Sequence, residues 1–315
     1  MKRRLLAMFL TAAMALSITA CGGDKGGSSI PAQSTEQSEE SADLPAGEDT
    51  KAEEAEAEPE VDPMKKALEN LESVTSMEAE MLMDMDLTLS ANGEEETMET
   101  STTMKMAMVE DPLKIKMEMV MDAGAQGTME MDMYAEVAED GTCMMYMNDG
   151  NAWTSQSVGV VDLDQYNAQN SMKNYIGEDT SIYKEEGKDT VNGASAYKYS
   201  YVMTGEEMKQ TMLSSGALDS VSALGLDESQ MESMLDGLGE ITTYVWIDEA
   251  TLYPVKYEMD MTEVMDKLMS NMIAAMGDQA AGMSMNVPKM TISMTCSNYN
   301  NVADFTIPEE AKTAE

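Results

Sequence analysis

The side chains with the most distinctive chemistry in this sequence are thioethers. Methionine accounts for 37 of the 315 residues, and all but three of the 37 follow residue 63. Many recur at every second position, as in residues 81–85 (Met-Leu-Met-Asp-Met), so a strand would place several sulfurs on one face. Soft thioethers select Cu(I), but they also fill cores and suit apolar ligands of variable shape. Because the methionines follow the burial pattern and no His or paired Cys joins them, core packing and an adaptable apolar surface are favoured over copper.

Histidine is absent, which excludes several kinds of active site. No Ser-His-Asp or Cys-His arrangement can form, and no imidazole is available as a metal ligand or as a general base near neutral pH. Apart from Cys21, the chain has only Cys143 and Cys296, which are too few for a disulfide framework. Each lies on an apolar strand face, so two buried thiols are favoured over a disulfide. With no nucleotide or phosphate motif, we expect neither an enzyme nor a cofactor.

Acidic side chains offer a second binding chemistry, the coordination of Ca²⁺. Residues 162–167 (Asp-Leu-Asp-Gln-Tyr-Asn) have the alternating acids that begin an EF-hand loop. Asn167 occupies the position of the loop glycine, however, and Lys173 occupies that of the bidentate glutamate. Asp and Glu pairs suited to glycoside hydrolysis are so abundant that they carry no information. We therefore expect no metal site and no catalytic residue.

Cys21 ends a segment with the layout of a signal peptide. Residues 2–4 are Lys-Arg-Arg, residues 5–18 form an apolar run, and the four residues ending at Cys21 are Ile-Thr-Ala-Cys. The last four resemble a bacterial lipobox, which implies cleavage before Cys21 and diacylglycerol on its sulfur. The alternatives are an ordinary signal peptide or a transmembrane anchor, but the run is below the roughly 20 residues that span a bilayer. We expect removal of residues 1–20 and lipid anchoring on the extracytoplasmic face of the cell membrane.

The segment after the cysteine is acidic and poor in apolar residues. Residues 22–62 contain 13 Asp or Glu against two Lys, among Gly, Ser, Ala and Pro. Residues 21–62 are therefore predicted to be the lipidated cysteine and a disordered tether with a reach on the order of 35 Å. The whole chain has a formal charge of -40, which repels phosphates and anionic headgroups and favours solubility. No nucleic-acid partner is expected.

Residues 63–160 change from helical to strand periodicity. Asp62-Pro63 is a cap followed by proline at the first helical position, and the apolar spacing from Met64 to Val74 predicts one helix. From residue 77 the period becomes 2. The alternation and the turn residues predict an antiparallel meander with one apolar and one wet face. Its strands are expected over 77–89, 98–108, 113–121, 129–135, 142–147 (between the turn residues 140–141 and 148–150) and from 152.

The second half mixes strands with helices. An irregular or helical stretch is expected over 163–175, a capping box at Thr204 and Glu207 opens a helical region to about 239, and Thr262 to Met276 is predicted to be an amphipathic helix. The remaining segments predict strands over 183–191, 196–203, 241–247, 252–261 and 290–296.

This order of parts resembles the LolA/LppX-like lipoproteins. The motifs behind the resemblance are the lipobox, the acidic tether, the first helix and meander, residues 246–248 (Trp-Ile-Asp) running into 253–256 (Tyr-Pro-Val-Lys), and the closing residues 307–311 (Ile-Pro-Glu-Glu-Ala). The resemblance implies an α+β domain over residues 63–312, in which a strongly curved antiparallel sheet forms a half-barrel and helices cover its concave face. It also implies an apolar cavity for acyl chains or another hydrophobic ligand.

The function expected is that of a membrane-anchored lipoprotein that binds or carries a lipid or other hydrophobic molecule. The alternative is a structural or protein-interaction module with a packed core and no ligand. Methionines on the predicted strands and on the helix at 262–276 are the candidates for lining the cavity: Met83, Met106, Met119, Met131, Met265, Met269 and Met272.

Overall fold

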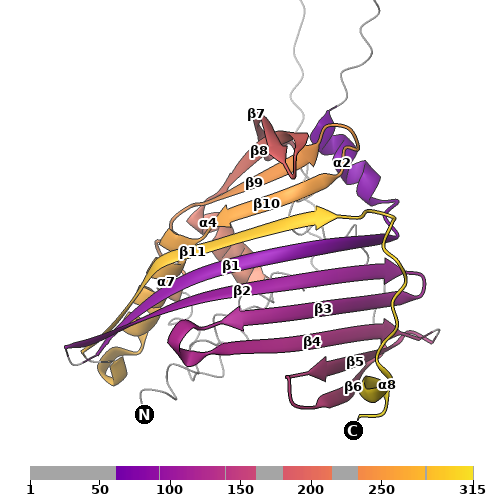
Figure 1. Cartoon of the computed structure of the whole chain (residues 1–315). Helices are drawn as coiled ribbons and strands as arrows, with labels where there is room; N and C mark the ends of the chain where they lie inside the picture. The colour runs from indigo at the N-terminus through magenta and orange to yellow at the C-terminus, as the bar shows by residue number, and fades with distance from the viewer. Residues whose placement is uncertain are drawn as a thin grey trace, which may run out of the picture.

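One open antiparallel sheet of 11 strands forms most of the computed structural model (Figure 1). The structure describes residues 62–91, 93–138, 140–160, 180–214, 233–280 and 282–314. The strand order is β6-β5-β4-β3-β2-β1-β11-β10-β9-β8-β7, so the sheet does not close and β6 and β7 are its edges. The predicted large antiparallel sheet is therefore confirmed. The predicted signal peptide, Cys21, the predicted tether, the stretch at 163–175 and residues 215–232 of the predicted helical region lie outside the described residues.

The first half of the chain is the predicted meander, in which each strand pairs with the next. Short connections and alternating side chains explain this local pairing. The elements are α2 (Pro63–Leu71), β1 (Ser76–Ala91), β2 (Glu94–Glu110), β3 (Leu113–Asp122), the short 3₁₀ helix η1 (Gly124–Gln126), β4 (Thr128–Val137), β5 (Thr142–Asn148) and β6 (Trp153–Val160).

The second half completes the sheet from the opposite edge and ends beside β1. Figure 1 shows the yellow strand β11 lying against the indigo strand β1, which joins the two halves into one sheet. The elements are η3 (Thr180–Ile182), β7 (Lys184–Val191), β8 (Ala194–Met203), α4 (Gly205–Ser214), β9 (Ile241–Asp248), β10 (Pro254–Asp260), α7 (Thr262–Ala275), η4 (Gly277–Ala280), β11 (Met283–Ser297) and α8 (Glu309–Lys312).

Local sequence explains several element boundaries. Asp62 caps α2 by accepting hydrogen bonds from the backbone N–H groups of Met64 (3.0 Å) and Lys65 (3.3 Å). The predicted capping box of α4 is confirmed, because Thr204 Oγ1 accepts from the Glu207 N–H while a Glu207 carboxylate oxygen accepts from the Thr204 N–H. No described helix is long and apolar enough to cross a membrane.

Strand register assigns each side chain to one of two faces of the sheet. Met77, Met81 and Met85 alternate along β1 and point to one side, which we call the inner face. The even-numbered β1 residues point to the outer face, where Lys105 and Glu80 form an ion pair of 3.9 Å. Directly paired residues of antiparallel strands share a face, so the register extends both faces across the whole sheet.

Two packed clusters occupy the inner face near β1. One joins Met64, Ala67 and Leu71 of α2 to Met77 of β1, and all four side chains are buried. The other joins α7 to the opposite end of β1, where Leu87 and Leu89 are buried. The two helices therefore pack on the same face at opposite ends of one long strand. That helices cover the whole concave face remains a prediction.

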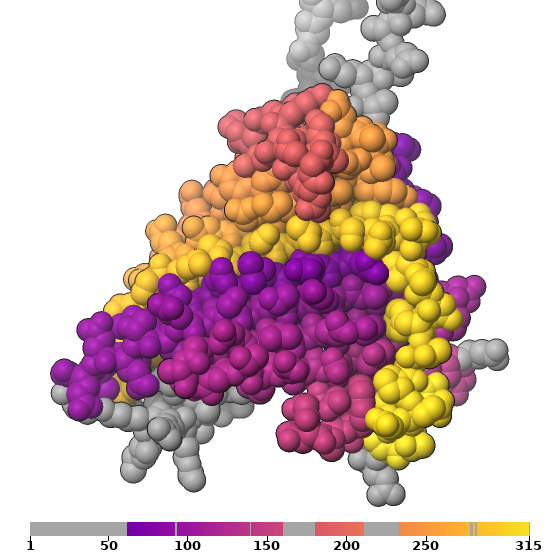
Figure 2. Space-filling view, viewed as in Figure 1, coloured from indigo at the N-terminus to yellow at the C-terminus, as the bar shows by residue number. Residues whose placement is uncertain are grey.

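The C-terminal segment packs on the other side of the sheet. Ile307 and Ala311 of this segment are buried against Tyr146 of β5, whose side chain points to the outer face. Figure 2 looks onto this side and shows the segment as a yellow band along the ends of the strands. Lys114 Nζ contacts Asp304 at 2.7 Å and helps to fix the band to β3. The C-terminal segment therefore packs on the outer face and does not cover the inner face of β3 to β5.

Candidate functional site: the methionine ladder

Twelve methionines of β2 to β5 point to the inner face, and nine of them are not buried. Met104 pairs with Met119, which pairs with Met131, while Met117 pairs with Met133 in the neighbouring row. Directly paired Cβ atoms lie roughly 4.5–5.5 Å apart, close enough for their side chains to touch. We call this set the methionine ladder: Met104, Met106, Met117, Met119, Met129, Met131, Met133, Met145 and Met147.

None of the nine ladder side chains is buried. Seven are partly exposed, and two at the rim are exposed, Met129 at 54% and Met147 at 41%. By contrast, Met121 on the same face is 3% exposed, and Met77 beneath α2 is 1% exposed. The ladder is thus an apolar surface between filled parts of the core, and an exposed apolar patch of this kind is typical of a binding surface.

Within the described strands, the inner face that holds the ladder carries no charged side chain from Met98 to Met108 of β2, beyond which Glu110 is the next inward position. Inward-pointing positions in residues 98–108, 113–121, 129–137 and 143–147 are Met, Thr, Leu, Ile, Ala, Val or Cys. The outward-pointing positions of the same strands hold charges, including the Lys116–Glu118 pair of β3 at 2.6 Å. Because charged and uncharged residues alternate along each strand, one face of the sheet is charged and faces solvent, and the other is apolar. The apolar face can take an uncharged group, and its flexible thioethers can adapt to the shape of that group.

Four of the seven predicted cavity residues lie on the strands. Met106, Met119 and Met131 belong to the ladder, and Met119 and Met131 are direct partners. Met83 of β1 is on the same face but packs at the edge of the α7 cluster. The sequence prediction left out six ladder members, which the same alternation could have placed on the face once the hairpin registers were known. These are Met104, Met117, Met129, Met133, Met145 and Met147.

The three predicted residues of α7 lie in a filled environment. Met265, Met269 and Met272 are 4–5% exposed and pack with side chains of β1 and β11, including Leu87 and Met285. The structure therefore does not bring these residues together with the ladder methionines. Their assignment as cavity residues remains a prediction.

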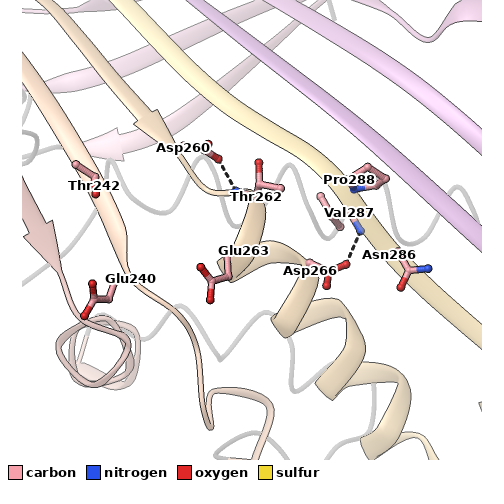
Figure 3. A pocket seen from close by; sticks show the side chains of 9 residues that line it. All are labelled: Glu240, Thr242, Asp260, Thr262, Glu263, Asp266, Asn286, Val287 and Pro288. Atoms are coloured by element: carbon pink, nitrogen blue, oxygen red, sulfur yellow. Dashed lines mark hydrogen bonds between the residues drawn. The ribbon is translucent and has the colours of Figure 1, made fainter.

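A separate groove beside α7 is polar. It has a volume of about 630 Å³ and is lined by nine residues, among them the four carboxylates of Glu240, Asp260, Glu263 and Asp266 (Figure 3). Asp260 accepts from the Thr262 N–H at 3.0 Å, and Asp266 accepts from the Val287 N–H at 2.8 Å. Hydrogen bonds from Thr262 hold the pKa of Asp260 below its usual value. Asp260 thus fixes the start of α7, and Asp266 joins α7 to the backbone of β11 at Val287. No group of described acids or cysteines could hold a metal ion.

Both cysteines of the described part are buried free thiols, as predicted. Cys143 lies on the inner face of β5 opposite Val137, and burial raises the pKa of its thiol. Burial also raises the pKa of Cys296 to about 12. A thiol that stays protonated is a poor nucleophile, so neither cysteine offers catalytic chemistry.

The comparisons with known proteins place the chain in a family. Residues 61–315 match the model of DUF6612, a family of unknown function, and the chain belongs to that family. A search of curated proteins found no match. Solved lipoprotein structures are similar to the chain, in keeping with the LolA/LppX-like resemblance of its motifs.

Three solved structures illustrate this similarity. Lipoprotein LppX of Mycobacterium tuberculosis is 11% identical, with 77% of this chain and 95% of that chain covered and a TM-score of 0.36. LprF of Mycobacterium bovis is 13% identical, with 79% and 95% covered and a TM-score of 0.37. A LolA superfamily protein of Nitrosomonas europaea is 9% identical, with 78% and 93% covered and a TM-score of 0.17. At these values the likenesses carry no information about the ligand of this chain.

Proposed function

We propose that this protein is a membrane-anchored, extracytoplasmic lipoprotein that binds a lipid or other hydrophobic molecule on its methionine ladder. The observation that carries the proposal is that nine of the twelve inward-pointing methionines of β2 to β5 are not buried. Burial of apolar surface contributes about 25 cal/mol per Å², so a ligand that covers the ladder is stabilised without any polar contact. The protein acts by binding rather than by catalysis.

The charge of the protein narrows the class of ligand. The formal charge of -40 opposes the approach of anionic molecules, and the described strands place no cationic side chain on the inner face around the ladder. The part of the ligand that contacts the ladder is therefore uncharged and apolar, such as an acyl chain. In this proposal, helices cover the concave face and complete the binding site.

A second candidate function is that of a protein-interaction module without a ligand. The filled clusters beneath α2 and α7 favour it, because these parts of the inner face are ordinary packed core. The two functions differ at the ladder, which is either a site for a small apolar molecule or a surface for a partner protein. Binding of a small neutral probe separates them.

The lipid anchor is tested independently of the ligand. Cys21→Ala removes the thiol that would carry diacylglycerol, and we expect the protein to move from the membrane and detergent phase to the soluble fraction. A Cys143→Ala variant is the control and should remain in the membrane fraction. Unchanged membrane partitioning of Cys21→Ala would show that another anchor is responsible.

The ligand site is tested with the neutral fluorescent probe N-phenyl-1-naphthylamine. Met119→Glu places a carboxylate among the ladder side chains, where covering it with an apolar molecule costs several kcal/mol. Val120 is the next residue of β3, points to the outer face and is 41% exposed, so Val120→Glu is a matched control. We expect Met119→Glu to weaken probe binding at least tenfold and Val120→Glu to leave it within about twofold, with both variants folded by circular dichroism. Equal binding by the two folded variants would contradict the proposed site.

A further inference from the structure

Two rim methionines of the ladder differ from the methionines of the packed clusters in their access to solvent. Met129 and Met147 are 54% and 41% exposed, whereas Met64, Met77 and Met285 are 1–2% exposed. Methionine oxidation follows exposure of the thioether, because the oxidant must reach the sulfur. A soluble peroxide therefore meets the ladder before it meets the methionines of the packed clusters.

The cysteines of the described part do not compete for the oxidant. Cys143 and Cys296 are 8% and 2% exposed, and burial raises the pKa of both thiols. Peroxide reacts with the thiolate rather than with the thiol, so these cysteines are protected on two grounds. The exposed thioethers are consequently the most accessible reduced sulfur in the described part of the chain.

We propose that the methionine ladder is a redox-modification site, at which peroxide converts thioethers to sulfoxides and thereby releases the hydrophobic ligand. In this step the sulfur of R–S–CH₃ gives two electrons to H₂O₂, an S–O bond forms, the O–O bond breaks, and the second oxygen leaves as water. The ligand-release part of this inference rests on the proposed function.

The strand register explains why oxidation of only a few methionines is enough to weaken ligand binding. Met147 is directly paired with Met133, which is paired with Met117, and Met117 is paired with Met106. A sulfoxide is polar and accepts hydrogen bonds, so one at Met147 adds a group that demands hydration at the rim of this continuous row. An apolar ligand that covered the row would leave that oxygen without a partner, which costs free energy. Oxidation at the rim therefore weakens binding away from the packed clusters, of which the α2 cluster contacts the row only at Met106, its opposite end.

The modification is reversible by the chemistry of the sulfoxide. A methionine sulfoxide reductase with a dithiol reductant returns R–S(O)–CH₃ to R–S–CH₃, with one disulfide and one water as the other products. Leucine has a similar volume and apolarity but cannot be oxidised, so it separates the chemistry of sulfur from the shape of the face.

The experiment treats the full chain with hydrogen peroxide, maps sulfoxides by mass spectrometry of peptides, and measures binding of N-phenyl-1-naphthylamine. We expect Met129 and Met147 to be oxidised at least tenfold faster than Met77 and Met285. Probe binding should weaken at least tenfold while circular dichroism is unchanged, and treatment with a methionine sulfoxide reductase should restore it. A variant with all nine ladder methionines replaced by leucine should bind the probe equally before and after peroxide.

Two results would overturn the inference, and they differ from failure of the proposed function. Equal oxidation rates of ladder and buried methionines would contradict the modification site. Unchanged probe binding after complete oxidation of the ladder would contradict the switch alone. If the untreated protein does not bind the probe, the proposed function fails and the switch fails with it, while the peptide map still decides whether the ladder is the site of modification.

Discussion

Met119 of β3 and Met131 of β4 are direct cross-strand partners on the inner face, and neither side chain is buried. In a sheet that merely filled its core, such a central pair would be covered, as Met85 and Met290 of β1 and β11 are. The two pairs differ in the side chains that pack over them. α7 packs over the latter pair, and the described helices contribute no buried side chain beside the former. Substitutions beneath α7 are therefore expected to change stability, and substitutions in the ladder are expected to change ligand binding.

A charge at Met269 is expected to unfold the domain. Met269 is 5% exposed in the α7 cluster, so Met269→Glu buries a carboxylate without a partner and costs several kcal/mol of unfolding free energy. Met269→Leu conserves volume and should cost less than about 1.5 kcal/mol. Urea unfolding followed by circular dichroism measures both. A Met269→Glu variant with the wild-type midpoint would show that the side chain is hydrated, as it would be in an open cavity.

The start of α2 should depend on its cap. Asp62→Ala removes the acceptor for the Met64 and Lys65 N–H groups and should lower the free energy of unfolding by about 1 kcal/mol. Asp62→Asn keeps an acceptor at the same place and should cost less. Equal stabilities of wild type and Asp62→Ala in urea would mean that tertiary packing alone sets the position of α2.

Acid should weaken the contact of Asp84 with its neighbours. The Ser101 hydroxyl donates to its carboxylate at 2.8 Å and Lys289 Nζ lies 3.1 Å away, and these groups lower the pKa of Asp84. Because the folded pKa lies below the unfolded value near 3.9, the contribution to stability is complete above that value. It is lost as pH falls through the folded pKa. The difference in stability between wild type and Asp84→Asn should therefore be largest at about pH 7 and shrink below about pH 4. A difference that stays constant with pH would contradict this assignment.

Most of the fold could be predicted because hydrophobic periodicity is local. The alternation in residues 77–135 and the turn residues place nearly every strand of the first half, and the Asn192-Gly193 turn is observed with φ of 51° and 85°. The exception is β11, which was expected from residue 290 but begins at Met283. A proline inside a segment argues against a strand there, which favours the later start. Pro288 nevertheless lies in β11, because the register with β1 shifts between Asp86 and Thr88 and the bulge accommodates the proline.

The candidate site could be predicted only in part, because it depends on long-range packing. Alternation places Met106, Met119 and Met131 on an apolar face, and the hairpin registers bring them together. The same pattern cannot tell a covered methionine from an uncovered one, since both are apolar and both alternate. Met85 of β1 and Met119 of β3 alternate alike in sequence, but Met85 is buried beneath α7 and Met119 is partly exposed.

Binding of a hydrophobic molecule to the methionine ladder is tested most directly by native mass spectrometry of the protein purified from its own host membranes. We expect wild type and Val120→Glu to carry a co-purifying apolar molecule and Met119→Glu to lack it, with all three proteins folded. A wild-type protein that carries no such molecule, or a Met119→Glu protein that carries the same amount, would contradict the assignment of the ladder as the binding site.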